Sequence, residues 1–319
     1  MEMNKQKIII DTDCGSDDAM AIAMALNDER YEVLIITTVS GNVRVDQAAF
    51  NTLTTLKMTD SYFPPVYIGR NDMLKRKWYG ADDTHGLDGM GDRDLVDYSL
   101  RPSEGDAVCE MIKTLNENPA GTIDIIALGP LTNLASIIEI DPESLRRARR
   151  IIAMATPGNA VGNITPYAEF NVWQDGEAFD RVLKFGHDSL LIVGWSACLD
   201  EAMLDEKEIE IIKKTNRLGQ YLIEANATLI KLNEMRFEAI CLDMADPAAM
   251  AVSLLPECIK EIRKCHVSVN LEEGEQYGEV FYDFDKTPNA EVVFSLKDDI
   301  FTKYIVDTIT KTDERCSSV

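Results

Sequence analysis

The sequence lacks the features that mark secreted, membrane-spanning and nucleic-acid-binding proteins. Its seven cysteines form no CxxC pair, and their odd number argues against a complete disulfide framework, so a reducing compartment is expected. No apolar run approaches a membrane span, and the start of the chain has no secretory hydrophobic region. Lys and Arg number 32 against 55 Asp and Glu, and the net charge of −23 disfavours a nucleic acid or anionic membrane as partner. We therefore expect a cytoplasmic protein whose ligand is neutral or cationic.

Histidine is also scarce, with three residues in the chain. One of them, His85, lies in the stretch 70–102, which is rich in glycine and is the least regular part of the sequence. A lone histidine in a loop is typically a solvated surface residue. A long glycine-rich loop inside a compact domain, however, is usually functional or mobile. The residues alone favour the surface interpretation of His85 without excluding the functional one.

Residues 8–18 carry the strongest chemical signal, an apolar run that ends in four aspartates. Three consecutive isoleucines predict a strand covered on both faces, and the Ala- and Met-rich segment after Ser16 predicts a helix with Ser16 as its N-cap. The carboxyl end of such a strand is where open α/β sheets bind ligands. Crowded carboxylates repel one another, and a hard cation is the simplest remedy. The alternative is an ordinary acidic first turn of a helix. The four aspartates are Asp11, Asp13, Asp17 and Asp18.

Strand and helix patterns alternate through the first two thirds of the chain, which predicts βαβ units and a mainly parallel sheet with helices on both faces. No linker, low-complexity tract or internal repeat interrupts residues 1–319, so we expect a single domain. Later segments at 103–115, 201–214 and 217–235 are expected to be helical, the first from a capping box at Ser103.

Polar residues also follow the later strands. Asn42 ends the second strand and should lie beside the first cluster if the two strands are neighbours. Asn163, Glu169 and Asn171 stand in one loop, where they could bind hydroxyl groups or form an ordinary Asn-rich turn. Asp246 precedes a proline, a position that suits a helix N-cap as well as a ligand role.

The run Asp-Thr-Asp-Cys-Gly-Ser-Asp-Asp-Ala resembles the N-terminal motif of the inosine-uridine preferring nucleoside hydrolases, in a variant with Cys14 in place of the usual proline. Further blocks match that family in the same order, from residue 8 to about residue 250. The resemblance implies a doubly wound α/β fold and Ca²⁺-dependent hydrolysis of the N-glycosidic bond of ribonucleosides to ribose and free base. It also implies a homodimer or homotetramer. The matching blocks are 40–43, 84–89, 129–133, 162–171 and 246–247.

The same resemblance implies roles for individual residues. Asp13 would be the general base, and Ca²⁺ would be held by Asp13, Asp18, Asp246 and the backbone carbonyl of Leu128. The expected substrate contacts are with the ribose, and Asp11 would support the metal ligands from behind. Asp17 and Asn171 would bind the 2′- and 3′-hydroxyls, Asn163 and Glu169 the 5′-hydroxyl, and Asn42 would line the pocket.

Two departures from the family pattern bear on the chemistry. Cys14 is expected to be a small buried spectator with a raised thiol pKa. Many family members carry a histidine where this chain has Ala245, so activation of the leaving base would fall to His85, to another pocket group, or to a base that leaves unaided. A non-catalytic nucleoside or ribose binder on the same scaffold is the alternative. A phosphatase with an Asp-x-Asp nucleophile would explain Asp11 and Asp13, but not the pairing of Glu169 with Asn171.

Overall fold

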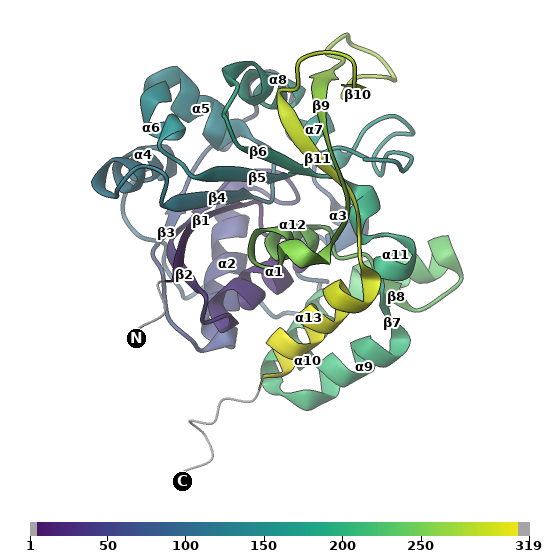
Figure 1. Ribbon diagram of the computed structural model, residues 1–319. Helices are drawn as coiled ribbons and strands as arrows, with labels where there is room; N and C mark the ends of the chain where they lie inside the picture. The colour runs from purple at the N-terminus through teal and green to yellow at the C-terminus, as the bar shows by residue number, and fades with distance from the viewer. Residues whose placement is uncertain (1–4, 312–319) are drawn as a thin grey trace.

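A nine-stranded sheet forms the centre of the computed structural model, which describes residues 5–311 (Figure 1). The strand order is β10-β9-β11-β6-β5-β4-β1-β2-β3; the run from β11 to β3 is parallel, and β9 is antiparallel to both of its neighbours. The strands are β1 (Gln6–Thr12), β2 (Tyr31–Thr38), β3 (Val66–Ile68), β4 (Ile123–Ala127), β5 (Arg150–Met154), β6 (Leu190–Val193), β9 (Ile259–Val269), β10 (Val280–Asp283) and β11 (Ala290–Leu296).

Helices cover both faces of this sheet, as the unbroken isoleucine run predicts. Ile8 and Ile10 point into one hydrophobic core and Ile9 points into the other, and none of the three is exposed. The first core packs under α1 (Ser16–Asn27), α2 (Val45–Thr59), α12 (Ala245–Leu254) and α13 (Asp298–Thr310). The second packs under α4 (Ala107–Glu117), α5 (Thr132–Ile140), α6 (Pro142–Arg146) and α8 (Gly176–Phe185). The single-domain α/β fold is thereby confirmed.

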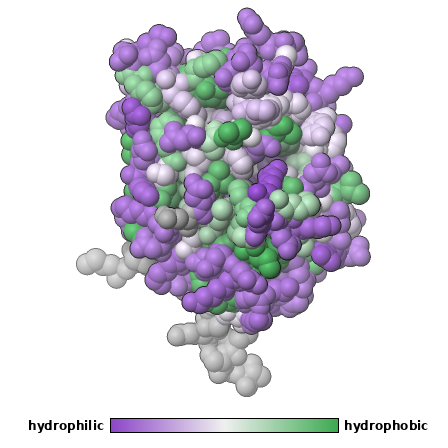
Figure 2. Space-filling view, turned by 90° about the vertical axis from the view of Figure 1, so that its right-hand side faces the viewer, coloured by the Kyte–Doolittle hydropathy of each residue, from purple (hydrophilic) through white to green (hydrophobic). Residues whose placement is uncertain are grey.

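A helical layer beside α13 departs from the expected two helices. It consists of α9 (Glu206–Thr215), α10 (Arg217–Ala225) and α11 (Ala227–Phe237), with a two-stranded sheet of β7 (Leu204–Asp205) and β8 (Cys241–Leu242). The predicted helix 217–235 breaks at Asn226, because the Asn226 amide donates to the carbonyls of Ser16 and Leu222, both at 2.9 Å. No helix among residues 5–311 is long and apolar enough to cross a membrane, and the face in Figure 2 is mostly hydrophilic.

Two predicted helix starts are wrong, those at Ser16 and Ser103, and the N-cap alternative for Asp246 is excluded as well. Gly15, not Ser16, is the N-cap of α1, and its N–H donates to Asp18 Oδ2 at 2.8 Å. Helix α4 begins after Asp106, whose carboxylate accepts from Cys109 N at 3.1 Å, and not at the Ser103 capping box. Asp246 lies inside the first turn of α12, so its side chain does not serve as the N-cap.

The sheet reverses its winding beside β1. The chain runs from β1 outward to β2 and β3, and returns to β4 on the other side of β1. Such a reversal opens a crevice at the carboxyl ends of the strands. Gly129, just beyond β4, lets the backbone approach Asp13 closely, since a Cβ there would lie 2.7 Å from Asp13 Oδ1. The crevice therefore lies directly above Asp13.

At the opposite end of the sheet, a buried ion cluster offers a test of stability. Asp124 of β4 is not exposed and pairs with Arg149 at 2.6 Å and Arg150 at 2.7 Å. Asp124→Asn should lower the free energy of unfolding by about 3 kcal/mol, because it leaves two guanidinium groups without their buried counter-charge. Urea denaturation measures this change.

The matched control is Asp180→Asn, which removes the half-buried i,i+4 partner of the exposed Lys184 on α8. Exposed pairs of this kind contribute about 0.3–0.5 kcal/mol. An equally small loss for Asp124→Asn would show that Arg149 and Arg150 recover their interactions with solvent, and that the buried cluster contributes no more than a surface pair.

Candidate active site

The carboxyl end of the sheet opens into a cavity of about 670 Å³, a size that suits a small organic ligand. The candidate residues were expected at the carboxyl ends of the strands, and the cavity lies there. They come from segments that are far apart in the sequence. Asp13 and Asp18 are not exposed and lie beneath its floor. The predicted site residues that line it are Asp17, Asn42, His85, Leu128, Asn163, Glu169, Asn171 and Asp246.

Three buried carboxylates form a close group at the floor of this cavity. Asp17, Asp18 and Asp246 each have an oxygen within 4.8 Å of the others. Burial, followed by the charge of Asp17, raises the pKa of Asp18 to about 7. Burial and then the charges of Asp17, Asp18 and Asp13 raise the pKa of Asp246 well above its ordinary value. Among residues 5–311 no Lys or Arg forms an ion pair with these three, although Arg236 lines the same cavity and His85 Nδ1 lies 3.8 Å from Asp17 Oδ1.

Asp13 adjoins this group and is also crowded by negative charge. Its Oδ2 accepts from Asn42 N at 2.6 Å, whereas its Oδ1 is buried without a hydrogen-bond partner among the described residues. Burial and then the charge of Asp18 raise the pKa of Asp13 well above its ordinary value. Asp17 Oδ1 is equally buried and unpartnered within residues 5–311. Oxygens with these properties fit a hard cation, which prefers carboxylate ligands.

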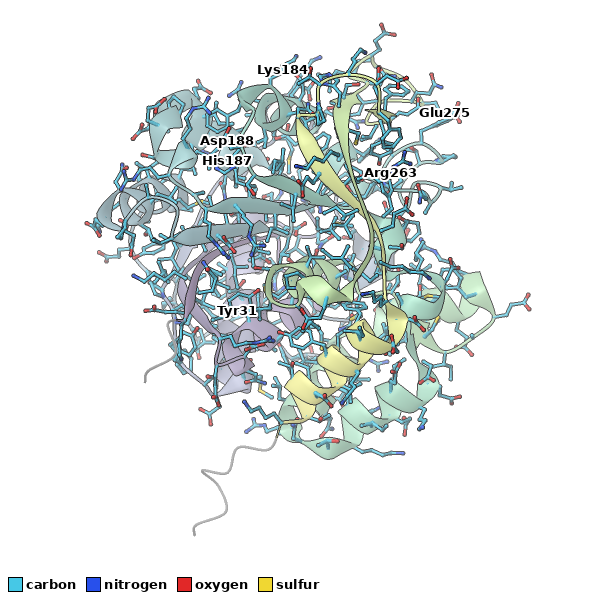
Figure 3. The ribbon with its side chains drawn as sticks, in the orientation of Figure 1. Tyr31, Lys184, His187, Asp188, Arg263 and Glu275 are labelled. Atoms are coloured by element: carbon cyan, nitrogen blue, oxygen red, sulfur yellow. The ribbon has the colours of Figure 1, made fainter. Side chains whose placement is uncertain are left out.

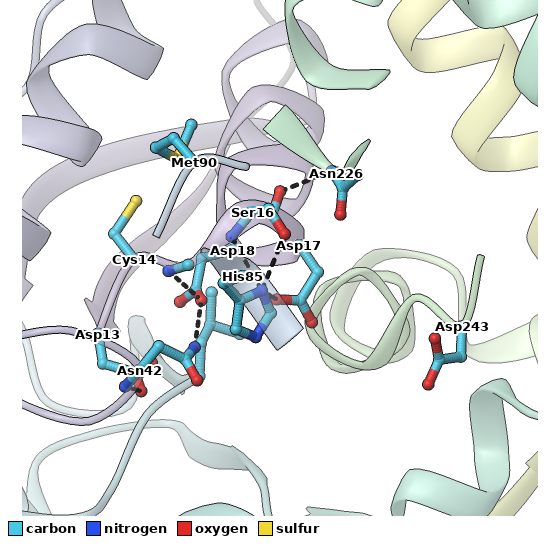
Figure 4. A network of polar contacts seen from close by, with 12 residues as sticks. Asp13, Cys14, Ser16, Asp17, Asp18, Asn42, His85, Met90, Asn226 and Asp243 are labelled. Carbon is cyan, nitrogen blue, oxygen red and sulfur yellow. Dashed lines mark hydrogen bonds and ion pairs between the residues drawn. The ribbon is translucent and has the colours of Figure 1, made fainter. Parts of the chain in front are cut away.

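The carboxylates are held in place by neighbouring donors (Figure 4). Asp18 accepts from the Thr12 hydroxyl, from Gly15 N at 2.8 Å and from Asn42 Nδ2 at 3.2 Å. Asp11 lies at the end of β1 and accepts from Thr37 Oγ1 at 2.6 Å and Asn133 Nδ2 at 2.7 Å. Asp11 therefore ties β1 to β2 and to the N-terminus of α5, which is a supporting position.

His85 is buried, so the surface interpretation is wrong. The irregular stretch 70–102 contains a short helix, α3 (Asp82–His85), that carries the imidazole to the cavity. Its Nδ1 lies 2.8 Å from Ser16 Oγ, 3.3 Å from Ser16 N and 3.8 Å from Asp17 Oδ1. Burial lowers the pKa of His85, and acceptance of the Ser16 N–H by Nδ1 leaves the proton on Nε2. The other two histidines lie elsewhere: His187 precedes β6 beside Asp188 (Figure 3), and His266 lies in β9.

The loop 163–171 brings its polar residues together through the start of α7 (Phe170–Gln174). Glu169 is the N-cap and accepts from Asn171 N at 2.8 Å, Val172 N at 3.1 Å and Thr156 N at 3.2 Å, while burial raises its pKa to about 7. Asn163 Oδ1 accepts from Phe170 N at 2.8 Å, which leaves the Asn163 amide N–H groups free to donate. The loop is thus an ordered turn whose polar residues Asn163, Glu169 and Asn171 line the cavity.

Leu128 connects this loop with the carboxylate floor. Its carbonyl accepts from Asn171 Nδ2 at 2.7 Å. A carbonyl oxygen has two lone pairs, so the Leu128 carbonyl can accept from Asn171 and still serve a cation.

The sequence-based prediction did not name several residues that line the cavity, among them Trp195, Arg236 and Asp243. Asp243 is buried, and its carboxylate accepts from Trp195 Nε1 at 3.1 Å and Asn233 Nδ2 at 2.7 Å. Trp195 and Asp243 both line the cavity. One feature of the sequence could have marked Asp243 as a site residue: it stands directly after the apolar pair of β8 and three residues before Asp246. By contrast Cys14 is buried with a strongly raised pKa, as expected of a spectator.

Comparison with known sequences identifies relatives along most of the chain. A family model described as inosine-uridine preferring nucleoside hydrolase matches residues 8–303. The probable uridine nucleosidase 2 of Arabidopsis thaliana is 32% identical over 255 residues, or 79% of each chain. The non-specific ribonucleoside hydrolase RihC of Salmonella agona (strain SL483) is 31% identical and covers 94% of this chain and 96% of its own. An uncharacterized protein of Schizosaccharomyces pombe is 43% identical over 180 residues, and the chain spans 58% of its length.

Solved structures agree with the sequence relatives. A plant nucleoside hydrolase, the PpNRh1 enzyme, is 29% identical with a TM-score of 0.89, covering 96% of this chain and 99% of that one. An inosine-guanosine nucleoside hydrolase is 26% identical with a TM-score of 0.85 and the same coverage. The chain therefore belongs to the inosine-uridine preferring nucleoside hydrolase family, whose members are N-glycosidases.

Proposed function

We propose that this protein hydrolyses the N-glycosidic bond of ribonucleosides to ribose and free base, with Ca²⁺ as its cofactor. The observation that carries the proposal is the set of buried carboxylates Asp13, Asp17, Asp18 and Asp246, which has no cationic partner among residues 5–311. A nucleoside is neutral and offers hydroxyl groups, which calcium accepts as ligands beside carboxylates. The names of the relatives, uridine nucleosidase and ribonucleoside hydrolase, support the substrate class.

The residues that would hold Ca²⁺ are Asp13, Asp18, Asp246 and the carbonyl of Leu128. When bound, the cation would offset part of the cluster's negative charge and lower the pKa of the attacking water. Asp17 lies within the same close group, and its unpartnered Oδ1 can accept from a ribose hydroxyl next to the metal. One divalent ion would therefore offset part of the negative charge of this cluster.

The protein's own groups account for the remaining steps. Asp13 accepts the proton of the water, because its Oδ1 is free while the Asn42 N–H fixes its Oδ2. As the base departs, positive charge develops on the sugar, and the nearby carboxylates stabilise that charge. Asn171 pairs with Asp17 at the 2′- and 3′-hydroxyls, and the free amide of Asn163 acts with Glu169 at the 5′-hydroxyl. The Nε2–H of His85 provides one hydrogen-bond donor inside the cavity.

The direct test is ribose release from a panel of ribonucleosides by the purified protein, measured with and without a calcium chelator. The proposal predicts release from at least one nucleoside and its loss on chelation. Calcium-dependent binding in calorimetry without any release over hours would instead establish the non-catalytic binder. The resemblance to the family also supports a homodimer or homotetramer, and the composition supports a cytoplasmic location.

Discrimination against 2′-deoxynucleosides tests the ribose contacts. Without the 2′-hydroxyl, Asp17 Oδ1 stays buried and unpaired in the complex. Sites built to hydrogen-bond a hydroxyl reject the analogue that lacks it by about 10⁴-fold in kcat/KM. We expect that ratio between uridine and 2′-deoxyuridine, measured on one preparation. A ratio below about 10 would remove Asp17 from the hydroxyl contacts.

A further inference from the structure

Hydrolysis of a nucleoside also requires a proton for the departing base, and the cavity contains few groups that could supply one. The assignment of that proton donor rests on the function proposed above. The acidic residues of the lining fall into separate classes. Asp17 and Asp246 belong to the carboxylate cluster. Asp82 and Asp83 are exposed to water, so they lack the low-polarity surroundings that keep a carboxyl protonated.

Glu169 and His85 line the cavity, but neither is well suited to donate a proton to the leaving base. Glu169 already accepts from three backbone N–H groups at the start of α7, on the side of the cavity assigned to the 5′-hydroxyl. The imidazole of His85 is neutral, because burial lowers its pKa, and a neutral Nε2–H donates a hydrogen bond but is a very weak acid. Neither group therefore combines a transferable proton with a place next to the base.

Asp243 is buried and lines the cavity outside both the carboxylate cluster and the α7 loop, and it accepts two hydrogen bonds where Glu169 accepts three. Its carboxyl lies in the cavity lining, apart from Asp13 and Asp18 (Figure 4), and is bonded to Trp195 and to Asn233 of helix α11. Trp195 Nε1 and Asn233 Nδ2 fix one oxygen each, which holds the carboxyl in one orientation toward the cavity. No Lys or Arg within residues 5–311 forms an ion pair with it, and burial raises its pKa.

We propose that Asp243 is the general acid that delivers the proton to the leaving base. In this step the C1′–N bond breaks and its electron pair goes to the base nitrogen system, which takes the Asp243 proton. The water oxygen bonds to C1′, and its proton goes to Asp13. The products are ribose and the neutral base, with Asp243 ionised and Asp13 protonated. Transfer of one proton from Asp13 to Asp243 through solvent restores the starting state.

The experiment compares two kinds of leaving group in the full-length, calcium-loaded protein. Ribonucleosides need a proton on the departing base, whereas p-nitrophenyl riboside releases a stable anion that needs none. Asp243→Asn keeps the size of the side chain but cannot deliver a proton. The kcat for uridine and inosine should fall by about 10²-fold or more, the range of general acid catalysis, while kcat for p-nitrophenyl riboside changes less than about threefold.

Two further variants separate acid catalysis from a structural role. Asp243→Glu restores a carboxyl and should recover part of the lost nucleoside activity. Trp195→Phe removes one of the donors that orient Asp243 and should lower nucleoside turnover more than p-nitrophenyl riboside turnover. Equal losses on both substrates for Asp243→Asn would show a structural role and overturn the proposal, as would unchanged nucleoside turnover. Absence of nucleoside hydrolysis by the unmodified protein would instead refute the proposed function itself.

Discussion

Replacing Asp13 with asparagine is expected to lower kcat for ribose release by about 10³-fold or more, since general-base catalysis alone supplies about 10²–10⁴-fold and the same side chain also serves the cation. The substitution keeps the shape of the side chain and its acceptor oxygen for Asn42 N. It also removes one charge from a crowded cluster, so the fold should remain intact. Steady-state kinetics with uridine and inosine, together with thermal unfolding, measure both effects.

Asp11→Asn is the matched control, because Asp11 is a buried carboxylate two residues away on the same strand end. Its oxygen can still accept from Thr37 and Asn133 after the substitution. We expect Asp11→Asn to lower kcat by less than about tenfold, as befits a supporting residue. Similar losses for both variants would mean that any buried charge at this strand end matters, and Asp13 would lose its role as base.

Replacing Asp246 with asparagine should have the second largest effect, on calcium binding. Asp246 is the only carboxylate of the close group that comes from outside the first βα unit. Loss of a ligand charge should weaken calcium binding by more than about 100-fold, beyond the 10–100-fold that outer-shell partners contribute. Calorimetric titration of the metal-free protein measures the affinity, with Asp180→Asn on the distant helix α8 as control.

In the absence of metal, the same substitution should raise thermal stability, although it weakens calcium binding. Without calcium, Asp246→Asn relieves repulsion with Asp17 and Asp18, so the variant should unfold at a higher temperature than the unmodified protein. Calcium at 100 times its Kd should then stabilise the unmodified protein by about 2.7 kcal/mol and leave the variant nearly unchanged. Equal stabilisation of both proteins would place the cation elsewhere.

Much of the fold was predictable because its signals are local. The run Ile8–Ile10 has no polar alternation, and the structure buries those residues on both faces of a parallel sheet. Strand ends were equally informative: Asp13, Asn42 and Asn171 follow separate strands, and parallel strands bring their carboxyl ends together at one edge. Alternation and order along the chain therefore sufficed to locate the cavity.

The features that were missed depend on contacts between distant segments. The break at Asn226 arises from a hydrogen bond to Ser16, 210 residues away in sequence. The burial of His85 depends on the packing of α3 beside α1 and α11, which nothing in a glycine-rich loop sequence reveals. Asp243 acquires its orientation from Trp195, 48 residues earlier. Helix propensity and hydrophobic periodicity depend on residues close in sequence, so they do not predict contacts between distant segments.

Ala245 stands where many family members carry a histidine, so another group would have to act on the leaving base. Ala245 lies in the lining beside Asp246, and a small side chain there leaves room between the cluster and Asp243. The acid proposed for the leaving base thus stands two residues before the position at which many family members carry histidine.

Binding of one cation to the buried carboxylates is expected to make this protein active as a ribonucleoside hydrolase. The most direct measurement is ribose release from uridine and inosine by metal-free protein as Ca²⁺ is added in known amounts. We predict no release before addition, and an activity that rises in proportion and saturates at one Ca²⁺ per chain. Full activity in the metal-free protein, or no release from either nucleoside after saturation with Ca²⁺, would contradict the claim.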